Sequence, residues 1–226
     1  MDPAGALERF ERLIDGDPAL VPLDRAALAI EDVLRGGVDE APALDLLDTL
    51  AAGCGERSFE GLRHHLFDEV GFAGDSQRYD DPENSFLQPV LTRRRGLPIL
   101  LATVMIEVGR RAGVGVVGIG MPMHFLVRDA TDPTALVDPF TGAMLDPEGA
   151  RALFESMAQG TLAWDDRHLE PVPARAIVVR ILSNLRASYR RRRDPVHAAL
   201  VAGLRWRVPE LSAERADAAR SVAVFN

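Results

Sequence analysis

The most apolar helix candidate in the sequence, residues 98–112, constrains the fold more than any other feature. Pro98 suits the first position of a helix, and Gly113 suits the residue after its end. Arg110 and Arg111 would then stand in the last turn, where cations favour the helix dipole. The apolar residues between these ends are Ile99, Leu100, Leu101, Ala102, Val104, Met105, Ile106 and Val108. Since such a helix has almost no polar face, we predict that it lies in the middle of the core.

The residues before this helix predict a layer of shorter helices. Over the first seventy residues, apolar side chains recur at spacings of three and four. Asp24, Asp39 and Ser58 stand where helix N-caps are expected. Gly36 and Gly53 stand where two of these helices should end. We therefore expect the N-terminal third of the chain to be helical.

Strand-like runs follow the central helix. Residues 114–119, 125–127 and 136–137 are rich in valine, isoleucine, leucine and phenylalanine. Turn-forming residues separate these runs. This order predicts a central helix followed by an antiparallel meander, and the fold class is therefore α+β.

Helical patterns return after residue 145. Asp146 and Asp194, each followed by proline, are suited to open helices, and Ser212 stands before a last one. Between them, one helical face carries Ile177, Val178, Ile181, Leu182 and Leu185. A chain of 226 residues is long enough for one substantial core and a small appendage. We therefore expect a main domain over residues 1–165 and a helical tail over 166–226 that packs on it.

Charge and cysteine content exclude several classes of function. The formal charge of −8 disfavours binding to the phosphate backbone of nucleic acid. The single cysteine, Cys54, cannot form an internal disulfide or a thiolate metal cage. No apolar run approaches the roughly 20 residues needed to span a bilayer, and the start lacks the pattern of a signal peptide. We expect a cytoplasmic protein that uses no cofactor or metal and binds neither nucleic acid nor membrane.

Three features have the order of a site for nucleophilic catalysis: the helix start near residue 98, His124 in one strand-like run, and Asp138 in the next. Thiol enzymes use a thiolate at a helix N-terminus, a histidine as base and acid, and a carboxylate that fixes the imidazole tautomer. We predict that His124 and Asp138 lie within hydrogen-bonding reach, roughly 2.6–3.2 Å. The thiol is missing. In a purely structural interpretation, His124 satisfies buried polar groups and Asp138 opens a turn.

Three segments in the same order resemble the transglutaminase-like superfamily. They cover residues 96–113, 121–128 and 137–140, and they contain Gly-Leu-Pro, Met-Pro-Met-His-Phe-Leu-Val-Arg and Val-Asp-Pro-Phe. The flanking Tyr79, Asp81-Pro82, Asn84-Ser85 and Arg94 to Pro98 are similar to the bacterial SirB-type branch, which often adds tetratricopeptide-like helices. The resemblance implies a papain-related core with N-terminal helices, a central buried helix, an antiparallel sheet and a C-terminal helical tail.

The resemblance also implies roles for single residues. His124 falls on the family's catalytic histidine and Asp138 on its aspartate, whereas Pro98 stands at the position of the nucleophilic cysteine. Because proline has no nucleophilic atom, thiol acyl transfer at this position is excluded. The expected lining of the cleft consists of Tyr79, Asn84, Ser85, Arg95, Gly96 and Met123.

Other candidate sites are weaker. Cys54 stands between two glycines at a helix end, and we interpret it as a buried thiol; Thr103 should face the core. Residues 113–118 have the glycine spacing of a dinucleotide fingerprint, but they follow a helix instead of preceding one. His64 and Asp68 lie four residues apart on one predicted helix and lack a third metal ligand.

Two functions are compatible with this sequence. In the first, the protein is a catalytically lapsed scaffold that binds an unidentified protein, peptide or small ligand in the cleft around His124 and Asp138, while its tail contacts a partner. In the second, it is a hydrolase in which His124 and Asp138 act as a general base that activates water on an amide or ester. The missing thiol favours the first.

Overall fold

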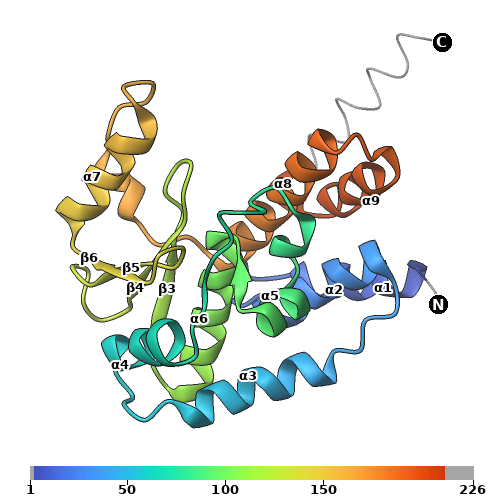
Figure 1. Cartoon of the computed structure of the whole chain (residues 1–226). Coiled ribbons are helices and arrows are strands. Elements are labelled where there is room, and N and C mark those ends of the chain that lie inside the picture. Colours follow the sequence, from blue (N-terminus) through green and yellow to red (C-terminus); the bar gives the residue numbers. More distant parts are fainter. Residues whose placement is uncertain (1–2, 212–226) are drawn as a thin grey trace.

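The computed structural model describes residues 3–211 (Figure 1). The first part of the chain forms α1 (Pro3–Ile14), α2 (Leu23–Arg35), α3 (Ala41–Gly53), α4 (Phe59–Arg63) and the π-helical segment η1 (His64–Glu69). The middle forms β1 (Ala73–Gly74), the 3-10 helix η2 (Pro82–Ser85), α5 (Leu87–Arg93), β2 (Arg95–Gly96) and α6 (Pro98–Ala112). The remainder forms β3 (Val116–Ile119), β4 (Leu126–Asp129), β5 (Leu136–Asp138), β6 (Ala143–Leu145), α7 (Pro147–Ala158), η3 (Asp166–Leu169), α8 (Ala174–Arg191), α9 (Pro195–Arg205) and η4 (Pro209–Leu211). The predicted α+β class is confirmed.

The predicted central helix is α6. It begins at Pro98, and Gly113 caps its end in the left-handed conformation, with a φ of 76°. Helices α2, α3, α5 and α8 and strands β3 and β4 all contact it. Figure 1 accordingly shows α6 between the sheet with α7 on one side and α1, α2, α8 and α9 on the other. An apolar surface on every side of the helix is what this position requires.

The starts of the N-terminal helices agree with the sequence prediction in part. Ser58 is the N-cap of α4, and its Oγ accepts a hydrogen bond from the Gly61 N–H at 2.9 Å. The prediction for Asp24 is wrong, because it is the second residue of α2 and its buried carboxylate binds Arg111. Asp39 lies one residue before the N-cap of α3. The helix dipole favours acidic residues throughout the first turn, so an aspartate does not by itself identify the first helical residue.

The predicted meander is a four-stranded antiparallel sheet in the order β3-β4-β5-β6. Val127 pairs with Val137, and both contribute to the main core around α6. On the other face, Leu126 and Leu136 pack in a second apolar cluster with Phe154 of α7. The sheet is therefore covered on both faces. The sequence prediction missed β6, because its three residues are largely exposed and are not the β-branched or aromatic types enriched in strands.

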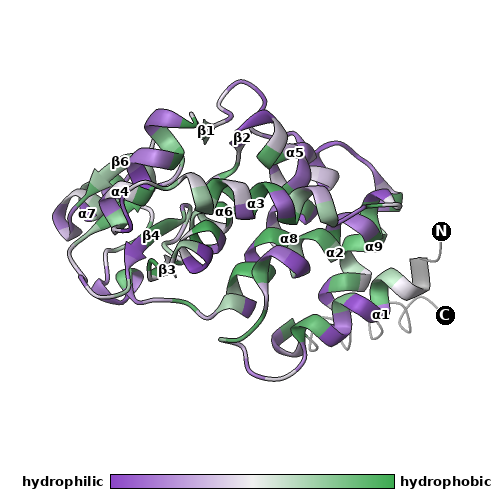
Figure 2. Ribbon diagram, turned by 90° about the horizontal axis from the view of Figure 1, so that it is seen from below, coloured by the Kyte–Doolittle hydropathy of each residue, from purple (hydrophilic) through white to green (hydrophobic). Residues whose placement is uncertain are grey.

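The C-terminal helices pack on the rest of the chain. Helix α8 contacts α2, α6 and η2, and α9 contacts α8 and α2. The apolar face predicted for α8 is buried in the main core, and Figure 2 shows hydrophobic and hydrophilic residues alternating along this helix. No helix among residues 3–211 is long and apolar enough to cross a membrane. The domain boundary at residue 165 and the tetratricopeptide-like character of the tail stay predictions. The helix expected at Ser212 lies outside the described residues.

Candidate functional site

His124 and Asp138 form a hydrogen-bonded pair. Nε2 of His124 lies 2.7 Å from Oδ1 of Asp138, and both side chains are less than a tenth exposed. The prediction that the two lie within hydrogen-bonding reach is confirmed. The prediction that His124 lies inside a strand is wrong. The residue ends a tight turn in which Met123 has a φ of 65° and the His124 N–H donates to the Met121 carbonyl, and β4 begins only at Leu126.

Three further hydrogen bonds fix the segment around Asp138. Oδ1 accepts the Phe140 N–H at 2.9 Å, Oδ2 accepts the Thr141 hydroxyl at 2.9 Å, and the Asp138 carbonyl accepts the Gly142 N–H at 2.8 Å. Burial on its own would raise the pKa of Asp138, but the bonds from His124, Phe140 and Thr141 outweigh it and hold the pKa below its usual range. Asp138 is therefore an ionised carboxylate in a rigid turn.

An ionised carboxylate only accepts hydrogen bonds, so Nε2 of His124 is the donor in this pair. In the neutral imidazole the other ring nitrogen, Nδ1, then carries the lone pair. Asp138 thus fixes one tautomer of His124, which is the part that a carboxylate plays in a catalytic triad. The pair can supply an oriented base or an oriented hydrogen-bond acceptor.

Strand β1 joins the start of α6 to this turn. The Asp75 N–H donates to the Gly96 carbonyl at 3.2 Å, two residues before Pro98. The neighbouring Gly74 N–H donates to the Phe140 carbonyl at 2.8 Å, two residues after Asp138. Gly74 also lies against the Phe140 ring, where a Cβ would come within 2.2 Å of a ring carbon. The sequence prediction missed Gly74, because no local pattern marks this tertiary contact.

The residues expected to line the cleft have different surroundings. The Asn84 side chain is buried, donates to the Arg78 carbonyl at 2.6 Å and accepts from Arg93 at 3.1 Å. Its backbone carbonyl accepts the Leu97 N–H at 3.0 Å, so Asn84 holds the preceding loop against the start of α6. The hydroxyl of Ser85 is buried and has no partner among the described residues.

Two others of this set lie at the turns that carry His124 and Asp138. Tyr79 is half-exposed, and its ring meets that of Phe140 edge-on at 6.0 Å. Met123 is exposed in the turn that carries His124. By contrast, Arg95 donates to the Gly71 carbonyl, and Gly96 is closely covered by a valine side chain. The role of these residues as cleft lining stays a prediction.

One charged residue near the pair was missed by the sequence analysis. Arg180 of α8 is half-buried, and its Nη2 lies 3.4 Å from the His124 carbonyl oxygen. Burial lowers the pKa of its guanidinium, and the nearby Tyr79 phenol acts in the opposite direction. The two residues lie 56 positions apart, and Arg180 belongs to the part of the chain that the sequence predicted only as a helical tail. No motif in the sequence connects them.

The possible substitutes for a nucleophile lie in structural positions. Cys54 is buried at the end of α3, and its Sγ donates to the Glu56 carbonyl at 3.1 Å. Burial and the charge of Glu69 raise the pKa of this thiol. Thr103 is fully buried inside α6 and donates to the Ile99 carbonyl at 2.8 Å. The interpretation of both as core residues is confirmed.

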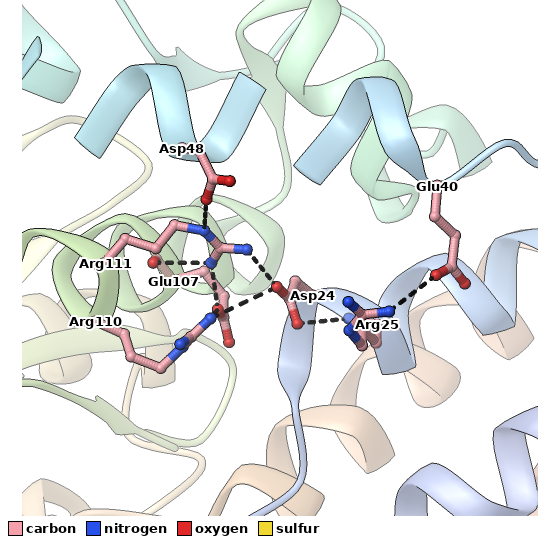
Figure 3. A network of polar contacts seen from close by, with 7 residues as sticks. All are labelled: Asp24, Arg25, Glu40, Asp48, Glu107, Arg110 and Arg111. Atoms are coloured by element: carbon pink, nitrogen blue, oxygen red, sulfur yellow. Dashed lines mark hydrogen bonds and ion pairs between the residues drawn. The ribbon is translucent and has the colours of Figure 1, made fainter. Parts of the chain in front are cut away.

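A second polar cluster lies at the opposite end of α6 (Figure 3). Arg111 donates to Asp24 of α2 at 2.5 Å, to Asp48 of α3 at 2.6 Å and to Glu107 of its own helix at 2.6 Å. Burial would lower the pKa of Arg111, but these carboxylates outweigh it and raise the pKa. Its neighbour Arg110 is mostly exposed and also pairs with Glu107. The cluster borders a pocket of about 580 Å³, and each charge in it has an opposite charge beside it. We interpret it as a structural anchor.

The remaining charged clusters give no metal site within the described residues. No group of three or more histidine, cysteine, aspartate or glutamate side chains there has the arrangement of a metal site. His64 bonds Asp68 at 2.9 Å without a third ligand. In the loop before η2, Asp80 and Asp81 form ion pairs with Arg191 and Arg192 of the tail.

Comparisons with known proteins show the family of the chain. The model of a family described as the transglutaminase-like superfamily matches residues 32–183. The chain is 39% identical to a UPF0162 protein of Xylella fastidiosa over 204 residues, which cover 81% of this chain and 70% of that protein. It is 31% identical to a UPF0162 protein of Pseudomonas aeruginosa over 208 residues, or 88% and 74% of the two chains. A shorter match, 33% identical over 69 residues, covers 30% of this chain and 11% of the F-box only protein 21 of Mus musculus. No solved structure matches the chain.

Proposed function

Because the chain belongs to the transglutaminase-like superfamily and to the UPF0162 family, we propose that it is a catalytically lapsed member that acts as a binding scaffold through His124 and Asp138. We place it in the SirB-type branch, with Pro98 at the position of the nucleophilic cysteine. The observation that carries the proposal is an intact, hydrogen-bonded His–Asp pair in a chain whose only cysteine lies elsewhere.

The chemistry of the helix start supports this reading. An acyl transferase of this family needs a thiolate at the N-terminus of the central helix, where the dipole lowers its pKa. Proline is well suited to that helix position but offers no nucleophile. Cys54 does not compensate, because it is hydrogen-bonded at the end of a different helix and its pKa is raised.

The retained side chains are suited to binding a peptide segment or a small ligand. Asp138 holds the His124 ring in one orientation, so that Nδ1 acts as a fixed acceptor or, when protonated, as a donor. Met123 supplies exposed thioether surface in the turn of His124, and Tyr79 supplies exposed aromatic surface against Phe140 in the turn of Asp138. Such a combination of one fixed polar group and adaptable apolar contacts is typical of ligand sites.

The alternative is a hydrolase without a protein nucleophile. The same bond from Nε2 to Asp138 favours it, because that bond leaves Nδ1 unprotonated and able to take a proton from water. Hydrolysis of p-nitrophenyl acetate by the wild type, with a large loss in His124→Ala, would overturn the scaffold proposal and support this alternative. The scaffold proposal expects the same slow rate for both proteins.

A test that requires no ligand is the substitution Pro98→Cys. Since the N–H of the first helical residue has no intrahelical acceptor, the change should cost about 1 kcal/mol or less. Pro98 is buried, so burial would raise the pKa of the new thiol, while the helix dipole and His124 would lower it. We expect the dipole and His124 to prevail, so that the thiol has a pKa below about 8.5, measured by the ultraviolet absorbance of the thiolate. It should then react with iodoacetamide near neutral pH faster than the likewise buried Cys54 does. Adding His124→Ala should raise the thiol pKa and slow the alkylation.

Pro147→Cys provides a matched control, because Pro147 is also the first residue of a helix but lies in α7, outside the His–Asp turn. Its thiol should be indifferent to His124→Ala. A thiol at position 98 that behaves like the one at 147, with no dependence on His124, would mean that Pro98 is not at the mouth of the site. The assignment of Pro98 to the cysteine position would then have to be withdrawn.

A further inference from the structure

Arg180 differs from the charged residues that hold this fold together. Arg180 is half-buried, and among residues 3–211 its side chain makes one hydrogen bond, a long one of 3.4 Å to the His124 carbonyl. No carboxylate among residues 3–211 pairs with it. By contrast, Arg111 at the other end of α6 binds three carboxylates. Arg180 therefore carries a positive charge that the described part of the chain does not neutralise.

Such a charge is costly to bury. A guanidinium stays protonated in proteins, so it cannot escape the cost of lost hydration by releasing its proton. Burial lowers the pKa of Arg180, and the only opposing influence is the phenol of Tyr79. A ligand that brings a negative charge to this position would offset the desolvation of the arginine. The energetics thus favour an anion from outside the described chain.

The neighbours of Arg180 place this charge at the candidate site. Its hydrogen-bond acceptor is the carbonyl of His124 itself. Tyr79, the phenol that acts on the pKa of Arg180, has its ring against Phe140 in the turn that follows Asp138. One helical turn further along α8, Asn184 is half-buried, and its side chain has no hydrogen-bond partner among the described residues. Residues four apart lie on the same face of a helix, so Asn184 supplies a second polar group beside Arg180.

We propose that Arg180 is an anion-binding subsite that receives a carboxylate of the ligand held against His124; this inference rests on the function proposed above. The planar guanidinium matches a carboxylate with two parallel hydrogen bonds. One unpaired arginine suits a single negative charge. At the end of the same helix, Arg191 and Arg192 are already paired with Asp80 and Asp81. The chain as a whole carries a net charge of −8, which disfavours the binding of polyanions.

The carboxylate has two possible sources, the C-terminus of a peptide and a small organic acid. The probes that separate them are N-acetylglycylglycine, its C-terminal amide, and acetate, with inorganic phosphate as a test of anion type. Binding is followed by NMR through the Arg180 Nε–Hε group and the ring of His124. We expect N-acetylglycylglycine to shift both signals and to bind at least about tenfold more tightly than its amide, as the loss of a charged hydrogen bond requires. Acetate that binds as tightly as the peptide would identify a small acid as the source.

The variants separate the charge from its geometry. Arg180→Gln should lower the affinity for N-acetylglycylglycine by at least about tenfold and leave the affinity for its amide unchanged. Arg180→Lys keeps the charge without the fork, so its affinity should fall in between. Arg190→Gln removes the same charge from an exposed position of the same helix and should have no effect. If Arg180→Gln does not fold, the wild type and Arg180→Lys still decide the matter through the comparison of carboxylate with amide.

Several results would overturn the subsite. Equal binding of carboxylate and amide at His124 would remove it while leaving the proposed scaffold function intact. Full affinity in Arg180→Gln, or phosphate binding far tighter than any carboxylate, would also contradict it. If no probe shifts either signal, the subsite is wrong, and the proposed function is then judged by the Pro98→Cys experiment, which requires no ligand.

Discussion

Asp138 serves both the turn and the histidine with one carboxylate. Its Oδ1 is shared by His124 and the Phe140 N–H, and its Oδ2 binds Thr141. The two interpretations of this residue from the sequence, a turn-opening aspartate and a partner for His124, are therefore compatible. Because the turn itself orients the carboxylate, the His–Asp pair keeps its geometry without any thiol at the helix start.

Replacing Asp138 by Asn should destabilise the protein at pH 7 by about 1–3 kcal/mol. The folded-state pKa of Asp138 is lowered, so its ionised form stabilises the fold above the unfolded-state pKa of about 3.9. This contribution is lost as the pH falls through the folded-state value, and the difference between variant and wild type should shrink there. Urea unfolding of both proteins at pH 7 and at acidic pH measures this difference in the free energy of unfolding.

Asp45 in α3 is exposed and provides the control for this experiment. Asp45→Asn should change the free energy of unfolding by less than about 0.5 kcal/mol at either pH. A loss of stability in Asp138→Asn that is the same at both pH values would show that the carboxylate charge is not responsible.

Glu31 should have the opposite pH dependence. Burial raises its pKa to about 7, against the hydrogen bond from the Gln88 N–H and the charge of Arg35. Between about pH 4.5 and 7, the carboxyl group of Glu31 is protonated in the folded protein but ionised in the unfolded chain. The free energy of unfolding therefore falls as the pH rises through that range. In Glu31→Gln this fall should disappear, which would change its stability relative to wild type by up to about 3 kcal/mol between pH 5 and 8. Parallel urea titrations of the two proteins that keep a constant difference would contradict this assignment.

At the scale of elements, the sequence predicted what local chemistry determines. The ends of α6 follow from Pro98 and Gly113, and the meander follows from its apolar runs and turns. The sequence did not predict strand β6 or the π-helical segment η1, because partial burial and helix type depend on neighbours distant in the chain. The candidate site could likewise be predicted only in part. Its motif marks His124 and Asp138, but the groups that surround them come from β1 and α8 and carry no local signal.

Strand β1 provides the clearest test of such a distant contact. Gly74→Ala would place a Cβ 2.2 Å from the Phe140 ring and would force the turn after Asp138 to move. We expect a loss of about 1–3 kcal/mol, the usual cost of overpacking, together with altered NMR signals of His124. In Gly55→Ala the new Cβ meets nothing within 4 Å, so this variant should behave like wild type. Thermal unfolding of both proteins distinguishes a specific clash from a general effect of replacing glycine.

For the molecule as a whole, α6 is the element to which the others attach, and its two ends are held differently. Hydrogen bonds through β1 connect its start to the His–Asp turn. Its last turn is held by the ion-pair cluster of Figure 3, in which Arg111 joins α6 to Asp24 of α2 and Asp48 of α3. Helices that lie far apart in sequence are thus fixed to one end of the central helix by a single side chain.

Arg111→Met should therefore be severely destabilising. The side chains of Asp24 and Glu107 are each 4% exposed, and removing Arg111 would leave two buried carboxylates without their main partner. Breaking a buried ion pair in this way costs about 3–5 kcal/mol. Arg110 pairs with the same Glu107, but its side chain is 61% exposed, so Arg110→Met should cost less than about 1 kcal/mol. Urea unfolding of the two variants measures both losses. Similar losses in both would contradict the prediction that the buried Arg111 stabilises the cluster more than the exposed Arg110 does.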